Sequence, residues 1–377
     1  MMTDLSELRQ ELHKNPELSG KEFQTAKYIT DFFKLNCPSA SIHAIGRTSL
    51  LIKYQGAESA KPVAIRCELD ALPIQEVSNF DYASVNKGVS HKCGHDGHMA
   101  IVAGLGLELQ KERPKGDVYL LFQEAEEDGE GARKILEDDY FSKMCNAEYI
   151  FALHNVPGYP INSVYIKRGN FTPSVISAVI TFKGKTSHAA EPQNGLNPAK
   201  SMAEIILKVD ELQKKSTTSG HTRIIATIHG NIGSEDYGIS AGSGQLGFTM
   251  RTNDNQDMRK LREEFSTLVD QICSSHEIYY ELNWLQEFSS INNDNDAVQF
   301  IENAANGLNM PLVKRDQEFP WGEDFGLFTE EFKGAMFCIG AGIDSPNLHN
   351  PDYDFPDQIT PSAIRLFQKI ITDIQND

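Results

Sequence analysis

The chain has 377 residues, of which 40% are apolar and 23% are charged. These values suit a compact protein of two or three domains and exclude both a small disulfide-linked scaffold and a mainly disordered chain. The formal net charge is −18, from 53 acidic and 35 basic residues, and such a surface repels phosphate backbones and anionic lipid. We therefore expect neither nucleic acid nor a membrane as a partner.

Neither an export signal nor a membrane-spanning segment is expected. No stretch approaches the ~20 apolar residues that a bilayer requires, and the beginning, MMTDLSELRQELHKNPE, is polar and charged throughout. The six cysteines are scattered without a CxxC pair, which favours a reducing compartment over a disulfide-linked, secreted fold. The expected location is the cytoplasm.

Apolar periodicity predicts two initial helices within residues 4–33, interrupted near Pro16, followed by strands that alternate with helices. The expected strands are 49–54, 62–67, 118–123 and 149–153, and the expected helices lie near 97–112 and 129–138. This alternation is typical of a mostly parallel sheet covered by helices on both faces.

A different order begins near Phe171. It reads strand, helix, strand, strand, helix, strand, over 175–183, 198–215, 222–230, 245–251, 257–275 and 277–284, with a polar connection at 213–220. That order is typical of a ferredoxin-like domain. The first pattern then returns, with a helix at 295–307, a strand at 335–340 and a final helix at 361–375.

The predicted fold is therefore α/β, with a smaller domain inserted into a larger one. The large domain, residues 1–170 and 285–377, should contain the mostly parallel sheet and the metal site. The inserted ferredoxin-like α+β domain should comprise residues 171–284.

The most informative segment is HKCGHDGH, which places Cys93 and His95 on either side of Gly94. Thiolate and imidazole both bind borderline-soft divalent metals, and glycine permits the sharp turn that would direct both side chains to one ion. We interpret His98 as a packing or supporting residue. The segment alone leaves metal binding and a histidine-rich surface turn about equally open.

Further candidate ligands follow the predicted strands at their carboxyl ends, where open α/β sheets bind ligands. They are Glu68 and Asp70 after 62–67, Glu126 and Glu127 after 118–123, His154 after 149–153, and His349 in the loop after 335–340. One acidic pair alone would be interpreted as a helix cap or a solvated turn. Together with the Cys/His loop, the set predicts a metal site at this edge of the sheet.

An ordered series of motifs resembles the M20 metallopeptidases, in particular their amidohydrolase branch, which includes N-acyl-amino-acid deacylases and hydrolases of indole-acetyl amino acid conjugates. The series runs through RQELHKNPELSGKEFQTA, RCELDALPI, HKCGHDGHMA, FQEAEEDGEGA, ALHN, GKTSHAAEPQNGLNPA, WGEDFG and LHNPDYDF. Each motif alone is weak, but their order is specific and covers nearly the whole chain.

The resemblance implies a site for two divalent ions, Zn or Mn, with Co or Ni also compatible with these donors. The implied ligands are Cys93, whose thiolate could bridge both ions, His95, Glu127, His154 and His349. The implied catalytic residues are Glu126 as the base, Asp70 as a carboxylate that orients the site, and His188 as a histidine that polarises the scissile carbonyl, in some members from a neighbouring subunit. Only the resemblance, and not the spacing, orders Glu126 and Glu127.

Several positions depart from the family pattern. Glu68 stands where relatives often have Asp, Gln193 stands where they often have His, and segment 238–246 differs from the familiar one, although Arg251 beyond it matches. These changes put the substrate in doubt more than hydrolysis. The acidic pair in WGEDFG matches a motif that lines the metal cleft, but an ordinary helix-end pair explains it equally well.

The expected function is metal-dependent hydrolysis of the amide of an N-acyl amino acid or a small peptide-like substrate, with Arg251 as an anchor for its carboxylate. A small-molecule amide is thus the expected partner, and a homodimer through the small domain is compatible with the resemblance. The alternatives are a metallo-dipeptidase or aminopeptidase, a binding or regulatory protein that kept the metal cleft, and a thiol amidase with Cys93 as nucleophile.

Overall fold

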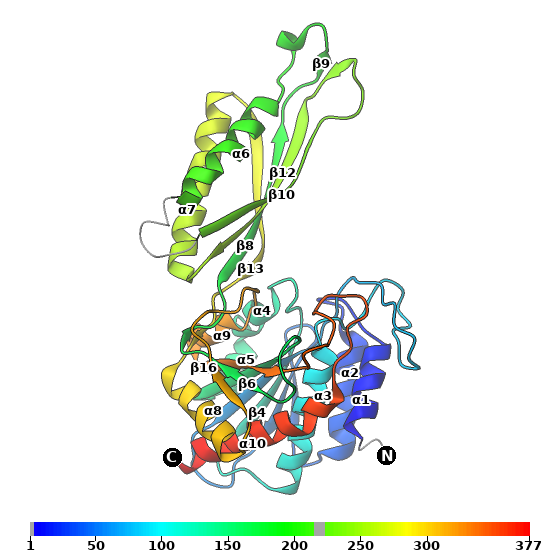
Figure 1. The fold of residues 1–377 in the computed structure, drawn as a ribbon, viewed down its shortest axis with the longest axis vertical. Helices are drawn as coiled ribbons and strands as arrows, with labels where there is room; N and C mark the ends of the chain where they lie inside the picture. Colours follow the sequence, from blue (N-terminus) through cyan, green and yellow to red (C-terminus); the bar gives the residue numbers. More distant parts are fainter. Residues whose placement is uncertain (1–3, 215–222) are drawn as a thin grey trace. The chain divides into compact units, whose positions relative to one another are not determined.

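The computed structural model describes residues 4–214 and 223–377, so His221 and most of the polar connection predicted at 213–220 lie outside the described residues. The chain divides into two compact units, described separately below (Figure 1). The first comprises residues 1–171, 291–319 and 323–377, and the second comprises 172–290 and 320–322. The second unit is therefore inserted into the first.

The first unit contains a mixed, mostly parallel eight-stranded sheet in the order β1-β2-β4-β3-β5-β16-β6-β15. The strands are β1 (Ser41–Ile45), β2 (Ser49–Tyr54), β3 (Val63–Glu68), β4 (Val118–Gln123), β5 (Tyr149–Val156), β6 (Val164–Ile166), β15 (Leu312–Lys314) and β16 (Lys333–Gly340). The central strands β4, β3, β5 and β16 are mutually parallel. Every residue of β3, β4 and β5 is buried, which is why these strands appear in the sequence as nearly continuous apolar runs.

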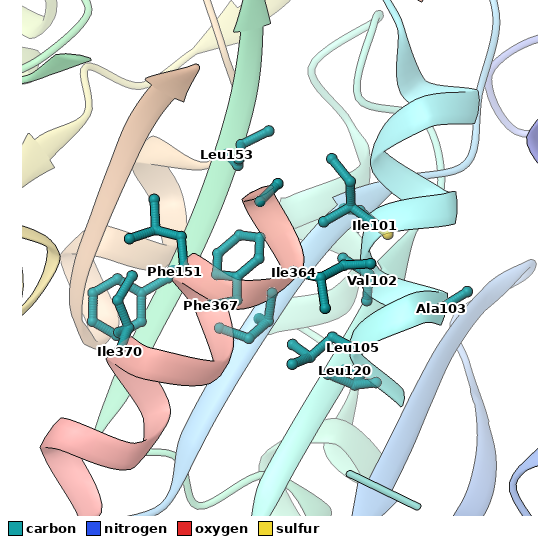
Figure 2. Packing of buried hydrophobic residues seen from close by; sticks show 14 of the residues in the cluster. Ile101, Val102, Ala103, Leu105, Leu120, Phe151, Leu153, Ile364, Phe367 and Ile370 are labelled. Atoms are coloured by element: carbon teal, nitrogen blue, oxygen red, sulfur yellow. The ribbon is translucent and has the colours of Figure 1, made fainter. Parts of the chain in front are cut away.

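Helices pack against this sheet and close its core. They are α1 (Leu5–Lys14), α2 (Phe23–Asn36), α3 (His95–Lys111), α4 (Gly131–Leu136), α5 (Asp139–Met144), α8 (Asn295–Gly307), α9 (Gly326–Glu331) and α10 (Thr360–Asn376). Figure 2 shows side chains of α3, such as Val102 and Leu105, packing with Phe151 of β5 and with Ile364 and Phe367 of α10. Burial of these apolar surfaces joins the helices to the sheet.

The helix predicted near 129–138 is present as α4, which is shorter than expected, and a second short helix, α5, follows it. The Asp138 carboxylate accepts hydrogen bonds from the amides of Tyr140 and Phe141, so it begins a new helix, α5. The sequence analysis also missed several two- or three-residue strands, which are too short to show periodicity. They include β6, β15, β7 (Gly169–Asn170) and β14 (Asn292–Asn293).

The second unit has the predicted ferredoxin-like order of elements. Its antiparallel sheet runs β10-β12-β8-β13. The elements are β8 (Ser174–Lys183), β9 (Ser187–His188), a 3-10 helix (Pro192–Asn194), α6 (Ala199–Lys214), β10 (Arg223–Ile232), β11 (Ile239–Ser240), β12 (Ser243–Thr252), α7 (Asn255–Ser275) and β13 (Tyr279–Phe288). The unit extends to Ser290, beyond the expected residue 284, because β13 continues to Phe288.

No helix among the described residues is both long enough and apolar enough to cross a membrane.

Candidate metal centre

The candidate centre lies at the carboxyl edge of the parallel strands in the first unit. Strand β3 ends at Glu68 opposite Gln123, the last residue of β4, and His154 of β5 lies opposite Cys338 of β16. Since these strands run in one direction, the segments that follow them meet at one edge. The structure therefore brings together the strand-end residues that the sequence analysis selected.

A tight turn places the Cys93–His95 loop at the same edge. Gly94 has a φ of 94° and precedes α3, which begins at His95. A Cβ atom at Gly94 would lie 2.5 Å from the Asn155 side-chain oxygen, so only glycine fits both the conformation and the space. Cys93 and His95 are buried and point to one side of this turn.

The five predicted ligands form two groups of three that share Cys93. The ligand atoms within each group lie within 4.8 Å of one another, and the groups are Cys93–His95–His154 and Cys93–Glu127–His349. Cys93 Sγ is 3.5 Å from His154 Nε2, and Glu127 Oε2 is 3.9 Å from His349 Nε2. A shared thiolate between two ligand groups suits a pair of ions with one bridging sulfur.

Buried polar atoms without partners also indicate that a cation belongs in this space. His95 Nε2 and Glu127 Oε1 lie 3.8 Å apart, and neither has a hydrogen-bond partner among the described residues. Unsatisfied buried polar atoms are rare because they lose their hydration without compensation. Imidazole nitrogen, carboxylate oxygen and thiolate sulfur are together a normal donor set for zinc and similar ions, so the residues fit such ions.

In His95 and His154, the ring nitrogen that would not face an ion has a protein partner. His95 Nδ1 lies 3.0 Å from the carbonyl oxygen of Asp70 and 3.3 Å from its carboxylate. His154 Nδ1 lies 2.8 Å from the Asn155 carbonyl oxygen. A hydrogen on each Nδ1 leaves Nε2 as the ligand atom. Burial and the neighbouring His98 lower the pKa of His154 to about 3, so its imidazole is in the neutral form that binds metals.

The Asp70 carboxylate connects several parts of the centre. Asp70 Oδ2 accepts hydrogen bonds from Ser19 Oγ at 2.8 Å and from the Glu127 amide at 2.9 Å. Burial by itself would raise the pKa of Asp70, but these bonds and His95 bring it below its ordinary value. Asp70 therefore remains ionised and orients His95 and Glu127 together.

Glu126 lies beside the donor cluster in a strongly acidic pocket. Its Oε2 is 3.8 Å from His95 Nε2, and its carboxylate lies within 4.8 Å of those of Glu323 and Asp324. Burial, followed by the charges of Glu323 and Glu127, raises the pKa of Glu126 well above its ordinary value. A carboxylate in this environment readily accepts a proton.

The sequence analysis missed Arg66, the cation that balances this pocket. Its guanidinium is fully buried and donates to Glu323 Oε1 at 2.9 Å and Asp324 Oδ1 at 2.7 Å, and it also pairs with Glu68. The signal was available, because an arginine inside a fully buried strand requires a buried partner. The acidic pair of WGEDFG is therefore bound to Arg66 rather than to solvent.

Glu68, which departs from the family pattern, pairs with neighbouring protein groups. Its Oε2 lies 2.7 Å from His98 Nδ1, and Arg66 contacts its other oxygen. His98 Nε2 lies 2.6 Å from the Asn155 side-chain oxygen, so both ring nitrogens of His98 have protein partners. The longer carboxylate of Glu68 is thus used to hold Arg66 and His98.

The two remaining predicted site residues, His188 and Arg251, belong to the second unit. His188 lies on β9, is exposed, and its Nδ1 accepts a hydrogen bond from the Ala190 amide at 3.0 Å. Arg251 lies on β12 and donates to the Pro320 carbonyl oxygen at 2.7 Å. Partial burial lowers the pKa of Arg251. Gln193 lies exposed on the 3-10 helix.

The protein is a two-unit α/β protein with a cluster of metal-binding side chains at the carboxyl edge of its parallel strands. Comparison with known proteins identifies its family. The sequence profile of the peptidase family M20/M25/M40 matches residues 64–373. The chain belongs to this family.

Similar proteins of known name cover nearly the full length. The chain is 28% identical to an N-acetylcysteine deacetylase of Bacillus subtilis, over 98% of this chain and 96% of that protein. It is also 28% identical to an N-acetyldiaminopimelate deacetylase of Exiguobacterium sibiricum, over 96% of each chain. A crystal structure of a dinuclear metal binding peptidase of the M20 family from Bacillus subtilis has a TM-score of 0.81 and 27% identity, and the match covers 99% of this chain and 98% of that chain.

Proposed function

We propose that this protein is a binuclear metal-dependent amidohydrolase that removes the acyl group from an N-acyl amino acid. The observation that carries the proposal is the pair of donor groups that share Cys93. The similarity to deacetylases of N-acetylcysteine and N-acetyldiaminopimelate supports an N-acyl amino acid as the substrate class, and the similar dinuclear peptidase supports the use of two ions.

The proposed ligand assignment follows the two donor groups. One ion would bind His95 and His154, the other would bind Glu127 and His349, and the Cys93 thiolate would bridge them. Zn or Mn is the expected metal, and Co or Ni also suits these donors. A pair of bound divalent ions lowers the pKa of water and stabilises negative charge on a carbonyl oxygen.

Glu126 is proposed as the group that moves the proton. Its carboxylate lies beside the donor cluster without belonging to either Cys93-containing group, so it is available to accept a proton from the attacking water. The protonated carboxyl would then donate that proton to the leaving amine nitrogen as the amide bond breaks. Arg66 pairs with Glu323 and Asp324 next to it and offsets part of the negative charge of this acidic pocket.

The second unit would contribute to substrate recognition. We propose that His188 polarises the scissile carbonyl and that Arg251 binds the substrate carboxylate, as the family resemblance implies. His188→Asn should then lower kcat, whereas Arg251→Met should raise KM for N-acyl amino acids more than for the matching N-acyl amines. Equal effects of Arg251→Met on both kinds of substrate would exclude carboxylate recognition.

The central experiment compares Glu126→Gln with Glu127→Gln, which are matched in size and charge change. Glu126→Gln should keep both ions and lower turnover by about 100-fold or more, because a positioned proton carrier is lost. Glu127→Gln should instead lower metal occupancy. Metal content and hydrolysis of a panel of N-acetyl amino acids and dipeptides are measured on both. Loss of an ion only from Glu126→Gln would reverse the assignment, and full activity of both variants would refute it.

A thiol amidase is the second candidate, because Cys93 Sγ and His154 Nε2 lie 3.5 Å apart. Burial and the nearby Glu127 and Glu126 raise the pKa of the Cys93 thiol well above its ordinary value, whereas a nucleophilic cysteine needs a lowered one. Full turnover after chelation of metal would favour this candidate.

A protein that binds metal but hydrolyses none of the amides or dipeptides would instead be a binding or regulatory protein.

A homodimer through the second unit is also proposed. Strand β10 is at the edge of its sheet, where unpaired backbone groups are open to another strand. Its side chains Ile224, Ile228 and Ile232 are 47%, 61% and 47% exposed. An exposed apolar strand at a sheet edge favours pairing with a second copy, which light scattering of the intact protein can detect.

A further inference from the structure

The two carboxylates of the proposed site, Glu126 and Glu127, follow a residue with unusual backbone geometry. Ala125 has a φ of 51°, in the left-handed region that is strained for a residue with a Cβ atom. Ala125 is fully buried and lies in the loop that follows β4, which ends at Gln123. Its conformation sets the direction in which the next two side chains leave the backbone, so whatever holds Ala125 also aims Glu126 and Glu127.

Hydrogen bonds hold Ala125 from both sides. Its carbonyl oxygen accepts from the amides of Gly131 at 2.9 Å and Glu130 at 3.2 Å, which are local contacts within the same loop. Its amide donates to Glu22 Oε1 at 2.8 Å. Glu22 is about a hundred residues away in sequence, at the N-terminus of α2, and is the partner that fixes the amide side of this strained residue.

Glu22 is itself held rigidly. It is 0% exposed, and its Oε1 also accepts from the Gly20 amide at 2.7 Å. Its Oε2 lies 2.8 Å from the Thr48 hydroxyl, which also lies 2.6 Å from Glu124 Oε2. A hydroxyl carries one hydrogen, so it donates to only one of these two oxygens. A hydrogen on Glu22 Oε2 satisfies the other contact, and burial raises the pKa of Glu22 in agreement with this arrangement.

The same N-terminal segment contacts the site at a second point. Ser19 donates to Asp70, whose same oxygen atom accepts from the Glu127 amide, and the Ala71 amide donates to the Glu17 carbonyl oxygen at 2.8 Å. The connection between α1 and α2 therefore supports the loop after β3 and the loop after β4 together. It does so without supplying any member of the two Cys93-containing donor groups.

We propose that Glu22 is a positioning residue for the Glu126–Glu127 pair, acting through the left-handed backbone of Ala125. This inference deepens the proposed function and depends on it. Glu22 accepts the Ala125 amide hydrogen, which stabilises the strained conformation that would direct Glu126 toward the reacting water and Glu127 toward the metal. Mutation of a residue that supports metal ligands in this way typically lowers metal affinity or activity by about 10- to 100-fold.

The test compares Glu22→Ala with Glu22→Gln as the matched control. Glutamine reproduces the hydrogen-bonding pattern, with its oxygen accepting from Ala125 and its NH₂ donating to Thr48, whereas alanine removes both contacts. Glu22→Ala should lower kcat and weaken metal binding by about 10-fold or more, with KM less affected. Glu22→Gln should stay close to wild type. Metal affinity is measured by competition with a chromogenic chelator for Zn²⁺, which does not require activity.

A second substitution, at Ala125, distinguishes a positioning role of Glu22 from general destabilisation of the fold. Glycine adopts positive φ without strain, so Ala125→Gly combined with Glu22→Ala should recover part of the lost metal affinity. If Glu22→Ala does not fold, Glu22→Asp replaces it. Aspartate keeps a carboxyl group but is shorter by one C–C bond, about 1.5 Å, so it should reproduce the loss.

The outcomes separate this inference from the proposed function. Unchanged Zn²⁺ affinity and kcat in a folded Glu22→Ala or Glu22→Asp protein would overturn the positioning role, as would a Glu22→Gln protein as impaired as Glu22→Ala. Wild-type protein that neither binds Zn²⁺ nor hydrolyses N-acetyl amino acids would instead refute the proposed function.

Discussion

The buried histidine of α1, His13, should make the stability of the first unit depend on pH in a defined direction. His13 Nδ1 lies 2.8 Å from Asp96 Oδ2, and His13 Nε2 lies 3.0 Å from Glu76 Oε1. Burial opposes the charged imidazolium, but the hydrogen bonds and charges of Asp96 and Glu76 outweigh it and raise the pKa of His13 to about 9. Arg9 and Lys92 contact the same two carboxylates.

The size of the effect follows from linkage. A rise in pKa from 6.5 to about 9 corresponds to at most about 3 kcal/mol of extra stability for the protonated, folded state. Because the folded pKa is raised, this contribution is fully present below about pH 6.5 and is lost as the pH rises through about 9. His13→Gln has no imidazolium, so it lacks this pH-dependent part.

The assay is chemical unfolding of wild type and His13→Gln at pH 6 and pH 9.5. Both tryptophans, Trp284 and Trp321, lie in the second unit, so hydrogen exchange of α1, rather than tryptophan fluorescence, reports on the first unit. The stability difference between the two proteins should be larger at pH 6 than at pH 9.5, by up to about 3 kcal/mol. A difference that is the same at both pH values would refute the reasoning.

Three other changes test neighbouring features of the structure. Arg66→Met should lower the free energy of unfolding of the first unit by about 3–5 kcal/mol in urea, because it leaves Glu323 and Asp324 buried without their cation. A smaller loss in the double variant Arg66→Met/Asp324→Asn would confirm the pairing. An additive loss would contradict it. Ile228→Lys, on the exposed edge strand β10, should shift the protein toward monomer in light scattering; an unchanged mass would place any dimer contact elsewhere. Removal of divalent ions should lower the unfolding temperature. Adding the ion back at about 100 times its Kd should raise the free energy of unfolding by about 2.7 kcal/mol. An unfolding transition that does not depend on the ion would exclude a site that binds in the folded state only.

Local patterns in the sequence determined most of the longer elements and their types, but not the shortest strands. The central strands are buried on both faces, so they appear as continuous apolar runs, and α8 spans residues 295–307 as predicted because Asp294 caps its first amides. The order of elements in the second unit was sufficient to predict its ferredoxin-like sheet. The segment around Gly94 and the strand ends also indicated which edge would collect histidines, a cysteine and carboxylates.

Contacts between distant segments were decided only by the tertiary structure. Arg66 pairs with Glu323 and Asp324, which lie 257 and 258 residues further along the chain. No local periodicity encodes such a pairing. The left-handed conformation of Ala125 is equally invisible in the sequence, because alanine disfavours it and Glu22, from another element, stabilises it. Periodicity reports which face of an element is buried, whereas the partner of each buried charge depends on how the elements pack.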